Sequence, residues 1–229
     1  MKSRAVLLTV VAIAASLCLG CSRTQPVANP PSPPAVPQAD PIAQPTAEPP
    51  QDDSAQDLQQ LLARALIPTF DFPDVDGFER GEIHNFEDPK QGYSFPYDSR
   101  TPKITATVYV YNRGLSEITD EIAKSKLKDE VDEVEQALPE MVRRGYYTSY
   151  TRLGDGERDF GSKKALWRSF EIGHTDGTLA SDVYVTATRN CFIKVRCTYA
   201  ADCGEVCENK ITSLIARLGE MVDAKKVAE

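Results

Sequence analysis

Four cysteines lie close together near the end of the chain, and their spacing supports two kinds of chemistry. They are Cys191, Cys197, Cys203 and Cys207. Clustered cysteines form disulfide bonds in exported proteins, or bind zinc as thiolates. Zinc would need His84 or His174 to arrive from far along the chain as a fourth ligand, and the cluster contains no paired Cys-x-x-Cys. The pattern therefore favours disulfides, and we expect no metal and no other cofactor.

A strand is expected over residues 191–199, and it limits how these cysteines can pair. Cys191 and Cys197 would lie roughly 20 Å apart on a straight strand, which is too far for a bridge. We expect a disulfide from Cys197 to Cys203 or Cys207, joining this strand to the last helix. A local Cys203–Cys207 bridge is the second choice, and Cys191 would then stay a buried thiol.

A second group of residues could bind a ligand through aromatic rings. Along the strand expected over residues 101–112, Tyr109 and Tyr111 alternate with aliphatic side chains. Trp167 and Tyr184 hold similar out-of-phase positions in later strands and could join them. If this face of the sheet is uncovered, it would bind a peptide, a glycan or a partner protein. The alternative is a second core layer beneath the first expected helix.

The residues that commonly carry catalysis do not form a known arrangement. The sequence has neither Gly-x-Ser-x-Gly nor His-Glu-x-x-His, and no glycine-rich phosphate loop follows a strand. His84 and His174 are expected at the surface. We therefore predict a protein that is not an enzyme, and the alternative is a cell-envelope hydrolase with an unrecognised carboxylate site. The net charge of −8 argues against nucleic acid as a partner.

The first residues have the features of a secretory signal. Lys2 and Arg4 precede an uncharged run from Ala5 to Leu19, which ends at the small residue Gly20. This run is short and rich in Ala and Ser, whereas a membrane-spanning helix needs about 20 apolar residues. Export is therefore expected, with the signal peptide over residues 1–20.

The segment Leu17-Cys18-Leu19-Gly20-Cys21 resembles the bacterial lipobox. The resemblance implies cleavage before Cys21 and attachment of diacylglycerol to its thiol, although Cys18 stands where the lipobox family usually has Leu. Acyl chains would hold the protein at a membrane surface. Ser22 follows the cysteine where Asp would favour the inner membrane, so the resemblance implies the outer membrane if the organism has one. The alternatives are ordinary secretion with Cys21 free, or an uncleaved anchor.

Residues 21–53 are predicted to form a disordered tether. They are rich in Pro, Ala and Gln and too poor in apolar residues to form a core. In the polyproline II conformation, some 30 residues would span on the order of 90 Å. Asn29 to Pro34 could also bind an aromatic groove, but a spacer between membrane and domain is the favoured interpretation.

Residues 54–229 are expected to form one globular domain. Hydrophobic periodicity predicts helices over 57–66, 125–145 and 204–224, with Pro139 kinking or splitting the second and Gly145 ending it. It predicts strands over 80–86, 93–97, 101–112, 146–152, 165–172, 180–188 and 191–199. The intervening loops include 154–156, 174–177 and 189–190, and the last two are predicted to be hairpin turns. The last helix would pack through Val206, Ile211, Leu214, Ile215, Leu218 and Met221.

This element order predicts the α+β class, with an antiparallel sheet of about six to seven strands and helices packed across its aliphatic face. The chain here resembles the PsbP-like α/β/α sandwich. The resemblance rests on Gly92-Tyr93-Ser94-Phe95-Pro96, the central helix, a late Tyr184-Val185-Thr186 strand and a closing helix. It implies an assembly or binding protein, and no photosystem-contact motif is present to carry over.

The sequence as a whole predicts a lipid-anchored binding or assembly protein that faces the periplasm or the cell surface. Its partners would be the membrane, through the lipid, and an envelope protein, while the domain itself would be monomeric. A carrier of lipids or small ligands is a further alternative, which an enclosed apolar pocket would support.

Overall fold

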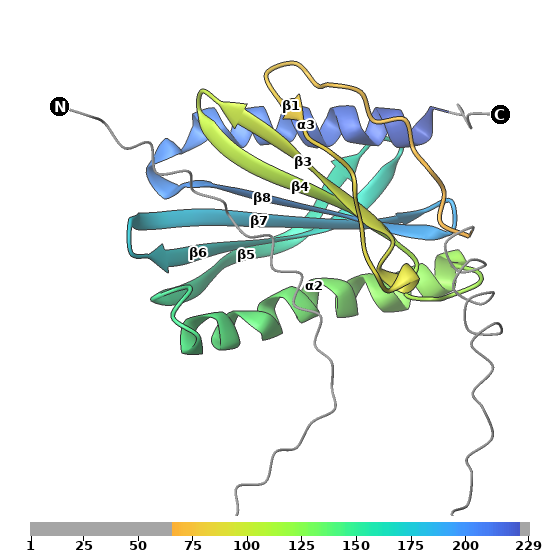
Figure 1. The fold of residues 1–229 in the computed structure, drawn as a ribbon, viewed down its shortest axis with the longest axis horizontal. Coiled ribbons are helices and arrows are strands. Elements are labelled where there is room, and N and C mark those ends of the chain that lie inside the picture. Colours follow the sequence, from red (N-terminus) through yellow and green to blue (C-terminus); the bar gives the residue numbers. More distant parts are fainter. Residues whose placement is uncertain (1–65, 225–229) are drawn as a thin grey trace, which may run out of the picture. The chain divides into compact units, whose positions relative to one another are not determined.

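The computed structural model describes residues 66–224 of the chain. The elements in chain order are β1 (Glu79–Arg80), β2 (His84–Asn85), η1 (Pro89–Gln91), β3 (Tyr93–Arg100), β4 (Lys103–Tyr111), α2 (Asp120–Arg143), β5 (Ser149–Phe160), β6 (Lys163–His174), β7 (Gly177–Thr188), β8 (Cys191–Ala200), η2 (Ala201–Cys203) and α3 (Glu205–Asp223). The expected signal, tether and first helix lie outside the described residues, apart from Leu66 at the end of that helix. Figure 1 shows the sheet between α3 and α2, which cover opposite faces.

The strands form one antiparallel sheet in the order β1-β3-β4-β8-β7-β6-β5, and β2 also pairs with β3. This arrangement confirms the predicted α+β class. The described residues contribute eight strands, because the segment expected as one strand over 80–86 forms two short strands, β1 and β2, along the same neighbour. The long strands β6, β7 and β8 pair through consecutive hairpins, and β8 also pairs with β4, which lies on the other side of α2 in the chain.

One side of the sheet, named here the α3 face, carries most of the apolar core. On β4 the aliphatic positions are fully buried, namely Ile104, Ala106, Val108 and Val110. They belong to one cluster with the buried side of α3, at Ile211, Leu214, Ile215 and Leu218. The predicted helix stripe is therefore confirmed at these positions but is wrong at Val206, which is 64% exposed. Cys207, one residue later, points into the core instead.

The opposite side, named here the α2 face, has a smaller apolar cluster. Val131 and Leu138 of α2 lie over Phe170, Val183 and Val185 of β6 and β7. The expectation that all helices pack on the aliphatic face of the sheet is wrong, because α2 covers the other face. The two central strands under α2 have apolar residues on both sides, which gives that helix a surface to bury against.

The helix α2 begins earlier than predicted and runs through its proline. Thr119 caps it by accepting a hydrogen bond from the Ile122 N–H at 3.3 Å, which places the start before Ser125. Pro139 lies exposed inside the helix and does not split it. Gly145 follows with a φ of +77° and donates to the Val142 carbonyl, which confirms its predicted role at the end.

The loop expected over residues 154–156 is instead part of β5. The register is irregular between Arg152 and Gly154, after which the strand continues to Phe160. A Cβ at Gly154 would lie 3.2 Å from the indole ring of Trp167. The glycine therefore marks a close approach of the backbone to a large side chain, and not a turn.

Candidate functional site

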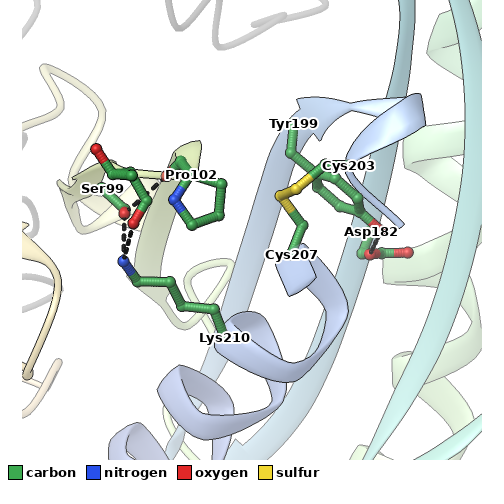
Figure 2. Close-up of a disulfide and its surroundings, with 8 residues drawn as sticks. Ser99, Pro102, Asp182, Tyr199, Cys203, Cys207 and Lys210 are labelled. Atoms are coloured by element: carbon green, nitrogen blue, oxygen red, sulfur yellow. Dashed lines mark hydrogen bonds between the residues drawn. A yellow bond between two sulfur atoms is a disulfide. The ribbon is translucent and has the colours of Figure 1, made fainter. Parts of the chain in front are cut away.

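The disulfide joins Cys203 to Cys207, with the two Cα atoms 5.7 Å apart (Figure 2). The preferred pairing through Cys197 was wrong, and the local bridge that was the second choice is the one formed. A spacing of four residues at a helix start places the two thiols about one turn apart, so this bridge needs no approach from a distant segment. Cys191 and Cys197 are free and buried. Burial raises the pKa of the Cys191 thiol to about 12, so it is protonated and behaves as an apolar side chain.

The four aromatic residues predicted to share a face lie on opposite sides of the sheet. Trp167 pairs with Tyr184, which pairs with Val195, which pairs with Val108, so both aromatic residues lie on the α3 face. Tyr109 is one residue out of phase with Val108 and lies on the α2 face with Tyr111. The predicted binding face is therefore wrong as a set of four.

The two aromatic residues of the α3 face have structural roles. The guanidinium of Arg158 stacks over the Trp167 ring at 4.0 Å, and Tyr184 is only 8% exposed. Burial raises the pKa of the Tyr184 phenol, so this residue is neutral at physiological pH. Neither side chain offers an open aromatic surface to a ligand.

Tyr111 is covered by α2. Its hydroxyl donates to Glu130 Oε2 at 2.6 Å, and Arg113 binds the same carboxylate through two hydrogen bonds of 2.8 Å. Burial first, and then the Glu130 charge, raise the pKa of Tyr111 well above its usual value. Tyr111 thus lies in a second core layer, as the alternative interpretation held, but among the described residues the helix above it is α2.

Tyr109 remains in a half-buried part of the α2 face, next to two cations of β8. Its cross-strand partner is Lys194, and Arg196 lies opposite Thr107 in the next row. The side chains of this region are all half-buried, and we refer to them as the basic strip: Thr105, Thr107 and Tyr109 of β4, with Lys194, Arg196 and Thr198 of β8. The α2 helix packs on β6 and β7, and so it covers the neighbouring part of the same face (Figure 1).

The basic strip was not identified from the sequence. Lys194 and Arg196 alternate with Ile193, Val195 and Cys197, and this alternation was a sign that the two cations share one face. What the alternation could not reveal was their distance from any carboxylate. That distance depends on where α2 packs.

A hollow of about 470 Å³, open to solvent, lies between β1, the end of β3 and α3. It is lined by Asp74, Gly77, Phe78, Glu79, Asp98, Ser99, Arg100, Thr101 and Lys210. Figure 2 shows Lys210 of α3 reaching Ser99, and its ammonium donates to the Ser99 Oγ at 2.6 Å and to the Thr101 carbonyl at 2.9 Å. This cation is therefore already engaged by the protein.

The carboxylates of the hollow are exposed, unlike those of typical catalytic acids, which are desolvated. Glu79 also pairs with Arg100 at 3.2 Å in an exposed ion pair. Most of the lining residues are polar or charged and the hollow is open to solvent, whereas a lipid carrier needs an enclosed apolar cavity. The hollow thus has the chemistry of neither alternative, and we take the basic strip as the candidate site.

Two further searches concern the described part of the chain. Within residues 66–224, His, Cys, Asp and Glu side chains form no group of three or more able to hold a metal ion. In the same range, none of the helices has both the length and the apolar character that a bilayer crossing requires.

Comparison with known proteins places the chain in no family. No family model matches it, and no curated protein does. Among solved structures, it is similar to the solution structure of cyanobacterial PsbP (CyanoP) from Synechocystis sp. PCC 6803, with 13% identity over 65% of this chain and 82% of that chain and a TM-score of 0.40. It is also similar to the crystal structure of LpqN, involved in cell envelope biogenesis, of Mycobacterium tuberculosis, with 12% identity over 65% of this chain and 80% of that chain and a TM-score of 0.33. Such distant likenesses carry no argument about what this chain does.

Proposed function

We propose that this chain is a lipid-anchored binding protein of the cell envelope that binds its ligand or partner through the basic strip. The observation that carries the binding role is the presence of two adjacent half-buried cations, Lys194 and Arg196, without a carboxylate partner among the described residues. Charges that are partly removed from water without a counter-ion are costly, and proteins keep such costly groups mainly at functional sites.

The sequence supports the anchor. A secretory signal is expected over residues 1–20, directly before Cys21 in a segment like the lipobox, and a proline-rich stretch follows before the folded domain. A lipid on Cys21 and an extended tether would let the domain reach ligands tens of ångströms from the membrane. The orientation toward the periplasm or the cell surface, and the outer membrane as the site, are part of this proposal.

The anchor is tested by expressing the full chain in a bacterium with two membranes and separating the extract with Triton X-114. We expect the protein in the detergent phase, with Cys21 as its first residue and an acyl mass on the N-terminal peptide. Cys21→Ser should move it to the aqueous phase or leave the precursor uncleaved. Cys18→Leu is the matched control, because it removes the neighbouring cysteine and places there the residue that the lipobox family usually has, and it should leave the anchor intact.

The binding role is tested on the purified lipoprotein in detergent with a small-molecule extract of the envelope. We expect the extract to shift the NMR signals of the β4 and β8 backbone, and the double variant Lys194→Met/Arg196→Met to lose that response. Lys103→Met is the control, because it removes one positive charge from an exposed position at the start of β4. A response that the double variant retains would contradict the role of the basic strip.

A further inference from the structure

The two cations of the basic strip come from one strand and point to one side. Lys194 and Arg196 flank Val195 on β8, and Val195 is fully buried on the α3 face. Both cations therefore lie on the α2 face, in neighbouring rows of the sheet, with Tyr109 and Thr107 directly across from them on β4. This arrangement is held by backbone pairing on both sides of β8, since that strand lies between β4 and β7.

Lys194 is held over aromatic rings without a counter-ion. Its Nζ lies 5.0 Å from the centre of the Tyr109 ring and 5.4 Å from that of Tyr111. The carboxylates whose charges act on Lys194 are Glu130 and Glu133 of α2, and both are already bound by Arg113. Burial lowers the pKa of Lys194 as a result of lost hydration. Among the described residues, no carboxylate lies within 4.0 Å of its ammonium.

Arg196 is oriented by two neutral hydroxyl groups. Its Nε donates to the Ser181 Oγ at 3.1 Å, and its Nη2 donates to the Tyr147 hydroxyl at 3.2 Å. A guanidinium has five N–H donors, so these two bonds leave part of its donor fork unused. Within the described range, Arg196 also lacks a carboxylate within 4.0 Å.

The lack of carboxylate partners for Lys194 and Arg196 is notable because this protein is rich in acidic groups. The chain has 34 Asp and Glu residues against 26 Lys and Arg residues. Arg168 lies on the same face as Arg196 and in the same row, and it is paired with both Asp132 and Glu135. Carboxylates are thus supplied where α2 covers the sheet, and the strip beside it keeps its positive charge.

We propose that Lys194 and Arg196, with the hydroxyls of Tyr147 and Thr107, form a binding site for an oxyanion, a carboxylate or phosphate group carried by a small ligand. This site rests on the proposed function and specifies the ligand. The free part of the Arg196 fork matches the paired oxygens of such a group, and Lys194 adds a point charge. The phenol and the threonine hydroxyl lie beside the cations and supply further hydrogen bonds.

A small ligand fits better than a membrane surface. The cations are half-buried rather than fully exposed, so a flat layer of lipid headgroups would reach only part of each side chain. The net charge of −8 also makes the protein as a whole unfavourable for an anionic bilayer. A discrete anion can enter where a surface cannot.

The test uses the full mature lipoprotein in a neutral detergent, titrated calorimetrically at low ionic strength with inorganic phosphate and with acetate. We expect saturable binding of at least one of the two, weakened about tenfold by Lys194→Met and lost in Lys194→Met/Arg196→Met. Lys194→Arg should restore binding to within about threefold, because it retains the charge. In a repeat at about 0.15 M salt, where the Debye length is about 8 Å, Lys103→Met should change affinity by less than about twofold, since its exposed charge lies four residues along β4 from Thr107.

Three results would overturn the oxyanion site: no saturable binding of either anion, equal weakening by Lys103→Met, or wild-type affinity in the double variant. Binding only to phosphatidylglycerol vesicles or only to a poly-glutamate peptide would also overturn it, in favour of a membrane or a protein partner. If the envelope extract still shifts β4 and β8 while both anions fail, the proposed function stands and the oxyanion site does not. If the envelope extract also causes no shift, both the proposed binding function and the oxyanion site are contradicted.

Discussion

Two arginines of the same sheet row show how differently the two halves of the α2 face are built. Arg168 of β6 and Arg196 of β8 are separated by Val183 of β7, hence by about 10 Å across two strand spacings. The Arg168 side chain is 8% exposed and lies 2.9 Å from Asp132 and 2.6 Å from Glu135, both on α2. Arg196 has only the hydroxyls of Ser181 and Tyr147.

The difference teaches that α2 divides one sheet face into a neutralised half and a cationic half. A buried cation needs a counter-charge, and Arg168 has two that α2 brings to it. Hydrogen bonds from Lys128 and then Arg168 lower the pKa of Asp132, so this carboxylate is ionised at neutral pH. The half beyond the edge of α2 keeps its cations unpaired, which makes it the part of the face that an external anion can complete.

The largest effect is expected from a comparison of two residues on opposite faces of β8. Ile193→Ala removes a side chain that is 1% exposed in the α3 face and should lower the free energy of unfolding by about 3 kcal/mol. Urea unfolding followed by circular dichroism measures it. A loss below about 1 kcal/mol would contradict a tightly packed core on that face, and Thr198→Ala on the basic strip is the half-buried control.

Removing the counter-charges of Arg168 should leave the part of the α2 face under α2 with an unpaired cation, as in the basic strip. Asp132→Asn with Glu135→Gln leaves this guanidinium under α2 without an ionised partner, at a cost of about 2 kcal/mol, because both carboxylates are partly exposed. The same urea experiment measures the loss. Asp129→Asn breaks an exposed ion pair with Lys126 and should cost no more than about 0.5 kcal/mol. Equal losses of unfolding free energy in the two variants would contradict the proposed difference between the covered half of the α2 face and the basic strip.

Lys194→Met should change the free energy of unfolding in the opposite direction and stabilise the protein. It removes a half-buried charge without a counter-ion, and the Met thioether still packs against the rings of Tyr109 and Tyr111. We expect the free energy of unfolding to rise by about 1 kcal/mol while oxyanion binding weakens, as is common when a residue is kept for function. A loss of stability would show that the cation mainly supports the fold.

The smallest expected effect is the change with pH in the stability difference between Lys194→Met and the wild type. Burial holds the pKa of Lys194 below its ordinary value near 10.5, so the unfolded chain binds its proton more tightly than the folded one. The cost of burying the charge is complete below the folded pKa and is relieved as pH rises toward the unfolded value. The stability advantage of Lys194→Met should therefore shrink by less than about 1 kcal/mol between pH 7 and pH 10. An advantage that grows with pH would refute the lowered pKa.

Much of the fold was predictable because its signals are local. The alternation in β4 identified this strand and its aliphatic side, since side chains of a strand point alternately to its two faces. The Arg189-Asn190 turn was predicted as a hairpin, and both residues have positive φ, as a tight hairpin turn requires. Gly145 likewise marked the end of α2 through its own conformation.

The errors came from interactions between distant segments. Gly154 and Gly156 indicated a turn, but the indole of Trp167 occupies the space above Gly154. Cys197 was expected to pair with a cysteine of the last helix, yet Cys203 and Cys207 satisfy each other. Tyr109 and Trp167 were assigned to one face because alternation within each strand does not reveal how neighbouring strands are aligned.

By itself, the sequence determined the class of the fold and the positions of most strands and both described helices. The signal that leads to Cys21 stays a prediction. These follow from periodicity, capping and composition, which are properties of neighbouring residues. Only the tertiary structure decided which cations have partners. The side on which α2 packs and the register of β8 against β4 and β7 set the distances between charges, and those distances separate Arg168 from Lys194 and Arg196.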